Sequence, residues 1–271
     1  MDMRVACVVL LLLGLGGPML ACAASPSETA FLALWKIHAA TNNDPATVRA
    51  ACRQYLEGHR DDPYAPVVLS IDAGQALCAR QTGDAAAIFT NLLTGGTGPV
   101  ADAARTMAER GLTRLDRERV KAALTAYYAV HVVFPETLAA LSADNRNPPP
   151  ATDRWGKPWR YRLAAYMELR GLQGQRYVLE SPAIGATSDL AGYLKQPFVS
   201  AANVKALRVL PAASGHAIIE FAFGDPKPGK VILAEGASYI GISFVRLASS
   251  FVLLSDGDRW LMVDLPGAGA P

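Results

Sequence analysis

A dense run of turn-forming and aromatic residues near the middle of the chain restricts its fold more than any other feature. The run is Asp153-Arg154-Trp155-Gly156-Lys157-Pro158-Trp159-Arg160-Tyr161. Before it, residues 119–134 carry apolar side chains at three- and four-residue steps, which is typical of an amphipathic helix. Residues 159–163 and 176–180 have the character of short strands. This stretch therefore predicts a helix, a tight turn and a small sheet.

The order of these elements resembles the globular half of the major pseudopilin of type II secretion systems. In that family a helix that ends near a proline is followed by D-x-W-G-x-P-x-x-Y and then by Y-x-L-x-S. The corresponding residues here are Tyr127, Pro135, Leu138, Asp153, Trp155, Gly156, Pro158, Tyr161, Tyr177, Leu179 and Ser181. The resemblance covers residues 119–181 and implies a pseudopilin-like α/β head. The family's calcium-binding loop corresponds to residues 181–190, where Asp189 is the only carboxylate, too few ligands for calcium.

Residues of the turn have predicted roles. Gly156 would allow a tight turn with a positive φ angle, and Pro158 would fix the entry into the strand. Trp155, Trp159 and Tyr161 could form a ligand-binding face, but the resemblance implies that they pack the sheet onto the long helix, where large aromatic side chains contribute most. A core position predicts that Trp155→Ala lowers the free energy of unfolding by about 3 to 5 kcal/mol.

The first 24 residues are typical of a secretory signal peptide. Arg4 is followed by the apolar run Val8 to Leu15 and by small residues suited to cleavage. Met19-Leu20-Ala21-Cys22 also resembles a lipobox, which would make Cys22 a lipidated N-terminus, and both processing routes stay open. We therefore expect a periplasmic or otherwise exported protein that contacts a membrane only if Cys22 is lipidated.

Residues 25–115 are predicted to form helical hairpins. Ser25-Pro26-Ser27-Glu28 is a capping box, and helix starts expected at Pro26, Pro63 and Pro99 lie 37 and 36 residues apart. This spacing resembles tetratricopeptide-like repeats. The segment Gly111 to Arg119 holds no break rich in proline and serine, so we expect the pilin-like helix to complete the helical stack.

Residues 201–271 change to an alternation with period two, which predicts a small antiparallel β-sandwich or barrel. The expected strands are Val204 to Leu210, Ala217 to Phe223, Lys230 to Ala234, Ser243 to Leu247, Phe251 to Leu254 and Trp260 to Leu265. The last part resembles the periplasmic homology region of the secretion clamp protein and the related type IV pilus lipoprotein. The predicted fold class is α+β, with a signal peptide at 1–24, helical repeats at 25–115, a pseudopilin-like helix and sheet at 116–200, and a β module at 201–271.

Composition and motifs exclude several functions. The chain has 271 residues and a net charge of +2, so its charge does not favour binding to nucleic acid. No catalytic, cofactor-binding or metal-ligand motif has the required spacing, so we expect no enzyme activity, no cofactor and no metal. The scattered residues His38 and His131 are interpreted as hydrogen-bonded structural residues. Cys52 and Cys78 could form a disulfide in an oxidising compartment or be two separate buried thiols.

The resemblance implies a non-enzymatic component or accessory of a type II secretion or type IV pilus-like envelope machine. Because the apolar N-terminal helix of pilins is missing, an adaptor or cap that contacts other machinery proteins is expected rather than a filament subunit. The alternative is an exported scaffold or ligand-binding protein for a glycan or peptide. An exposed cluster of Trp159, Tyr161 and Tyr166 would favour that alternative.

Overall fold

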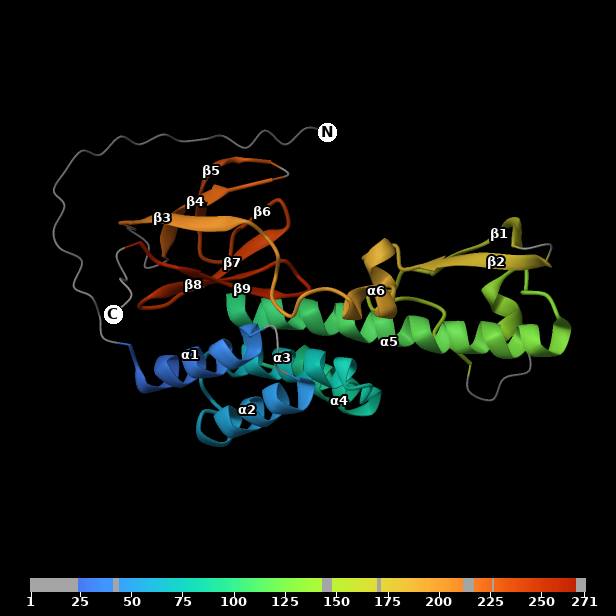
Figure 1. Cartoon of the computed structure of the whole chain (residues 1–271), viewed down its shortest axis with the longest axis horizontal. Helices are drawn as coiled ribbons and strands as arrows, with labels where there is room; N and C mark the ends of the chain where they lie inside the picture. Colours follow the sequence, from blue (N-terminus) through green and yellow to red (C-terminus); the bar gives the residue numbers. More distant parts are fainter. Residues whose placement is uncertain are drawn as a thin grey trace.

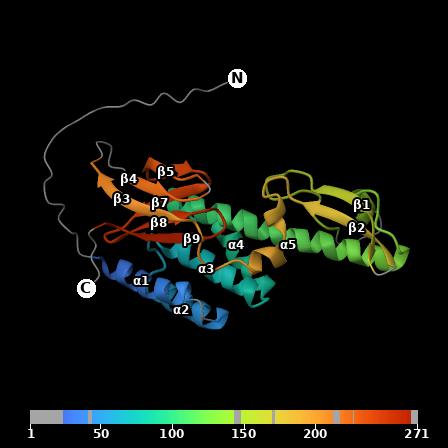
Figure 2. The same ribbon diagram turned by 45° about the horizontal axis from the view of Figure 1, so that its top comes forward.

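The computed structural model describes residues 24–40, 44–142, 148–169, 172–211, 217–225 and 227–266. Cys22 and the rest of the predicted leader before Ala24 lie outside the described residues. The described chain combines helices with antiparallel sheets, which confirms the α+β class. Figures 1 and 2 show an elongated molecule, with most elements gathered around one end of a single long helix.

Five helices form the first layer. They are α1 (Pro26–Ala39), α2 (Pro45–Gly58), α3 (Ala65–Cys78), α4 (Thr82–Leu93) and α5 (Pro99–His131). Each of the first four packs against the next helix along the chain, as expected for stacked hairpins. Two starts carry side-chain caps, because Ser25 Oγ accepts from Glu28 N at 3.1 Å and Asp44 Oδ1 accepts from Thr47 N at 3.0 Å.

The start of α3 differs from the prediction. Helical structure begins at Ala65 rather than at Pro63. The carboxylate of Asp62 accepts hydrogen bonds from Tyr64 N and Tyr55 Oη, both at 2.8 Å. These bonds hold residues 62–64 in a turn that precedes the helix, so Asp62 stabilises the turn and does not cap the helix.

The C-terminal part forms a sandwich of two antiparallel sheets. The first sheet has the order β3-β4-β5, with β3 (Val204–Leu210), β4 (Ile218–Phe223) and β5 (Gly229–Ala234). The second has the order β6-β7-β8-β9, with β6 (Ser238–Tyr239), β7 (Ile242–Leu247), β8 (Phe251–Ser255) and β9 (Trp260–Asp264). All six expected strands are present, and β6 is an additional short one. Ile219 and Phe221 of the first sheet meet Phe244 and Val252 of the second in a shared core.

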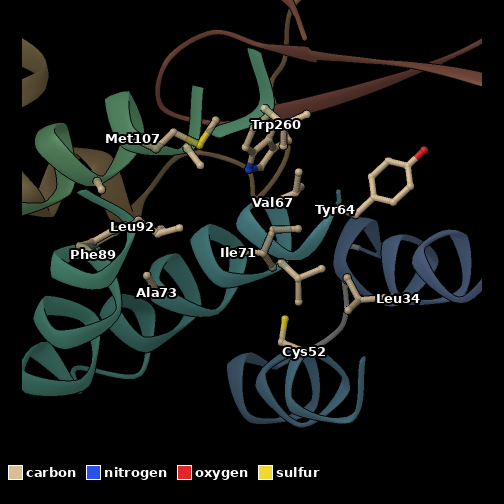
Figure 3. Close-up of a cluster of buried hydrophobic side chains, with 14 of the residues drawn as sticks. Leu34, Cys52, Tyr64, Val67, Ile71, Ala73, Phe89, Leu92, Met107 and Trp260 are labelled. Carbon is tan, nitrogen blue, oxygen red and sulfur yellow. The ribbon is translucent and has the colours of Figure 1, made fainter. Parts of the chain in front are cut away.

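The strand β8 joins this sandwich to the helices. All five of its residues are buried, whereas a strand on the outside of a sandwich would alternate. Val252 and Leu254 face the other sheet, while Phe251 and Leu253 belong to the core of the helical layer. Trp260 of β9 lies beside α3 (Figure 3), where its indole N–H donates to Ser70 Oγ at 2.7 Å. The helices and the sandwich therefore form one three-layered body, in which residues on both sides of position 200/201 contribute to the core of the helical layer.

The remaining elements form an arm on the distal half of α5 (Figure 1). This helix is continuous across the expected boundary at 115/116, in agreement with the absence of a break there. The arm contains the 3₁₀ helix η1 (Leu138–Leu141) and the antiparallel hairpin of β1 (Arg160–Leu169) and β2 (Leu172–Glu180). Its own core joins Val120 and Leu124 of α5 to Trp159 and Leu179. The chain then returns to the body through η2 (Ala186–Ser188) and α6 (Leu190–Leu194).

Candidate functional site

The turn before β1 is built around the carboxylate of Asp153. This side chain is only 4% exposed. Its Oδ1 accepts from the backbone N–H groups of Trp155 at 3.0 Å and Lys157 at 2.9 Å, and its Oδ2 accepts from Ser181 Oγ at 2.7 Å. Because Ser181 follows β2, one buried carboxylate fixes the entry and the exit of the hairpin. Asp153 therefore has a structural role in the motif.

The two turn-forming residues take the predicted conformations. Gly156 has φ +71°, a region that a side chain would disfavour, and its N–H donates to Asp153 O at 3.0 Å. Pro158 pairs with Thr152 in an isolated bridge immediately before β1. The turn is therefore held by the hydrogen bond from Gly156 to Asp153 and by the pairing of Thr152 with Pro158, and both precede β1.

The prediction that Trp155 is a core residue is wrong. Trp155 is only partly buried and belongs to none of the hydrophobic clusters of the described residues. Trp159 occupies the core position instead, with 6% exposure, and its indole N–H donates to Pro150 O at 2.9 Å. Trp159, Tyr161 and Leu163 occupy alternate positions and therefore lie on the same face of the strand, whereas Trp155 lies within the turn, where that alternation does not apply.

Three aromatic side chains of the arm, Phe134, Tyr161 and Tyr177, pack against one another. Tyr161 is partly buried and its hydroxyl donates to Pro135 O at 2.7 Å, while its ring lies 6.0 Å from that of Tyr177. The ring of Tyr177 meets Phe134 edge-on at 4.7 Å. The side chain of Tyr166 lies outside the described part. Trp159 and Tyr161 thus do not form the exposed face that would favour glycan binding.

A buried ionic cluster fastens α5 and α6 to the sandwich. Asp258, in the turn before β9, accepts from Arg110 Nε at 2.7 Å and from Arg114 Nη2 at 2.6 Å. The guanidinium groups of Arg114 and Arg259 lie against the Tyr193 ring, 4.2 Å and 3.7 Å from its centroid. Burial alone would raise the pKa of Asp258, but the hydrogen bonds and charges of Arg110 and Arg114 outweigh it and lower that pKa. The cluster is a structural ion pair rather than an acid-base site.

His38 lies beside this cluster as a buried structural residue, and its ring lies close to the backbone of Phe198. Its side chain is 3% exposed, and neither ring nitrogen has a hydrogen-bond partner within the described residues. Burial, followed by the charge of Arg259, lowers the pKa of His38 from 6.5 to about 4, and a backbone interaction with Phe198 offsets part of this shift. His38 is therefore neutral at pH 7. The other interpreted histidine, His131, is exposed at the end of α5.

The remaining sequence-predicted site residues have structural roles or none. Cys52 and Cys78 are free cysteines, so of the two alternatives the structure contains separate thiols, and burial raises the pKa of both. Asp189 caps α6 through Gly192 N at 2.8 Å and pairs with Arg117 at 2.9 Å. Across the described ranges, no group of three or more histidine, cysteine or acidic side chains is placed to hold a metal ion.

A groove between the helical layer and the sandwich is the best candidate for a binding site. Its volume is about 510 Å³, which is within the range of peptide- and small-molecule-binding sites. The apolar lining comes from the starts of α3 and α5 and the end of α4, with Pro66, Leu69, Leu92, Pro99 and Val100. The opposite wall carries Glu235, between β5 and β6, and Arg246 of β7.

The turn between α4 and α5 gives this groove a defined edge. Gly96 has φ +47° and Gly98 has φ +101°, so both adopt a left-handed backbone that glycine tolerates best. Arg105 donates to the carbonyls of Gly95 at 3.3 Å and Gly96 at 3.1 Å, which fixes the turn against α5. The charged side chains Arg60, Asp61 and Asp62 complete the rim on the helical side.

Sequence reasoning missed this groove because its residues come from three helices, three turns and one strand that lie far apart in the sequence. The glycine-rich segment Thr94-Gly95-Gly96-Thr97-Gly98-Pro99 was the available signal, since such a segment ahead of a long helix indicates a special backbone conformation. Nothing in the sequence pattern placed Arg246 opposite that segment.

Comparison with protein-family models, with curated proteins and with solved structures finds no match for this chain. The resemblances to a pseudopilin, to a clamp protein and to tetratricopeptide-like repeats therefore stay predictions. Among the helices described, none is both long enough and apolar enough to cross a membrane.

Proposed function

We propose that this protein is a non-enzymatic, exported component or accessory of a type II secretion or type IV pilus-like envelope machine, and that it acts by binding other proteins. The supporting observation is that one uninterrupted helix, α5, connects a groove-bearing body to an arm with the predicted pseudopilin-like order of elements. The arm supplies a hairpin with two open strand edges, which are suited to pairing with another chain. The groove supplies a second contact surface on the same molecule.

Site-specific photo-crosslinking in the native envelope tests this proposal. A photoreactive residue would replace Arg162, exposed on the arm hairpin, or Thr97, exposed at the groove. A third position, Arg53, is exposed on α2 and serves as the control surface. We expect the first two positions to capture pseudopilins, a secretin or its inner-membrane clamp. If only unrelated proteins are captured, or all three positions give the same products, the assignment to such a machine is wrong.

The second candidate function is an exported protein that binds a peptide or glycan outside any secretion machine. The groove between the helices and the sandwich favours the peptide form of this candidate, because its apolar lining and charged rim suit a peptide better than a sugar. Loss of partner capture from the arm, together with retained capture at Thr97, would select this candidate over the first.

A further inference from the structure

The groove lined by Arg60, Leu69, Pro99, Glu235 and Arg246 contains an arginine, Arg246, that has no carboxylate partner among the described residues. The Arg246 guanidinium lies over the Tyr64 ring, 5.2 Å from its centroid. Within the described residues its buried Nε has no hydrogen-bond partner and Arg246 forms no ion pair, so the neutral Tyr64 side chain is the group that its guanidinium interacts with. The buried arginines of the body differ, since Arg49 and Arg114 pair with carboxylates, and Arg259 donates to the backbone carbonyls of Pro197 and Tyr193. Arg246 is therefore placed to receive an anionic group from outside the chain.

The surroundings of Arg246 restrict what that group can be. The neighbouring groove lining is apolar, because Leu69, Leu92 and Val100 contribute to it. The rim carries Arg60, Asp61 and Glu235, none of which forms an ion pair within the described residues, so its two carboxylates offset much of the positive charge and disfavour a ligand with several negative charges. The acceptor capacity of Asp62 is partly used by Tyr55 and Tyr64. A single carboxylate next to apolar side chains fits this combination better than a phosphate or an acidic run.

We propose that the groove binds the C-terminal end of an apolar peptide, with the terminal carboxylate on Arg246 and the last side chains against Leu69 and Val100. The volume of about 510 Å³ admits a few residues. The inference deepens the proposed function, because it names the kind of segment that a protein partner would present to the body.

Fluorescence anisotropy with a defined probe tests the inference. The probe is a fluorescein-labelled Ala-Ala-Ala-Leu-Val peptide with a free C-terminus, and its counterpart has an amidated C-terminus. We expect the free acid to bind at least about tenfold more tightly, since a charge-assisted pair with a guanidinium is lost in the amide. Equal binding of both peptides, or binding of neither, overturns the inference. This comparison changes only the ligand and does not depend on how a variant folds.

Protein variants locate the contact. Arg246→Gln should remove the preference for the free acid, and Arg246→Lys should keep only part of it because lysine lacks the planar fork. Arg208→Gln is the matched control: Arg208 lies on the first sheet, is 64% exposed and pairs with Glu220. Thermal unfolding of each variant reports whether the fold is retained. Unchanged binding by a folded Arg246→Gln protein places the carboxylate elsewhere and contradicts the assignment, whatever partners crosslinking has found.

Discussion

At the scale of single residues, Trp155 within the arm turn and Trp159 after it differ in their contribution to stability. Trp159 is buried against α5, so Trp159→Ala should lower the free energy of unfolding by about 3 to 5 kcal/mol. Trp155 is partly exposed, so Trp155→Ala should lower the free energy of unfolding by less than about 1.5 kcal/mol. This value replaces the larger loss expected from sequence. Urea denaturation of both variants distinguishes them, and a greater loss for Trp155→Ala would contradict the assigned core.

His38 should make the protein less stable in acid. Its pKa is 6.5 in the unfolded chain and about 4 in the folded protein, so between these values the unfolded chain binds a proton that the folded protein excludes. Stability is full above pH 6.5 and falls by roughly 3 kcal/mol as the pH drops to 4. The thermal midpoint measured from pH 7.5 to 4 should show this fall. In His38→Phe the fall over that window should be smaller, and an identical slope in both proteins would exclude His38 as its source.

At the scale of elements, the approach of α4 to α5 depends on Gly111. A Cβ atom there would lie 2.4 Å from a ring carbon of Phe89, whose side chain is buried. Alanine is the better helix former by about 1 kcal/mol, yet Gly111→Ala should destabilise the protein by about 1 to 3 kcal/mol because the overlap outweighs that preference. A Phe89→Leu background supplies the control. In that background Gly111→Ala should lower the free energy of unfolding by a smaller amount. If Gly111→Ala stabilises the protein that keeps Phe89, α4 moves away from α5 without cost and the prediction is wrong.

The strands were largely predictable, and the packing around them was not. The period-two pattern located β3 and β4 within a residue, because alternation reflects a sheet with one face in a core. It did not show that β8 is buried on both faces, although its apolar run Phe251 to Leu254 is consistent with that. The positive φ angle at Gly156 was predictable because glycine is the residue that adopts such an angle most readily. The groove was not, because Arg246 and Pro99 meet only through tertiary packing.

At the scale of the whole molecule, Asp258 holds the sandwich to α5 across 148 positions of sequence from Arg110. Asp258→Ala would leave Arg114, which is 1% exposed, as an uncompensated buried charge, and should cost about 3 to 5 kcal/mol. Because the folded-state pKa of Asp258 is depressed, this stabilisation is present above its ordinary pKa of 3.8 and is lost as the pH falls through the lower folded value. Chemical denaturation at pH 7 measures the cost. Asp102→Ala, which removes an exposed pair with Arg105, is the control and should change stability by less than about 1 kcal/mol.

The 33 residues of α5 correspond to a rod about 50 Å long. One end of the rod borders the groove and the other carries the arm, so the separation of the two contact surfaces is set by helix geometry rather than by a flexible tether. Two partners held at once would be kept at a fixed spacing, and a single partner would need matching sites at that distance to gain avidity. The protein would then act as a molecular spacer. Inserting four residues into α5 between the body and the arm should alter which partners can be bound at the same time. The affinity for each partner alone should stay unchanged.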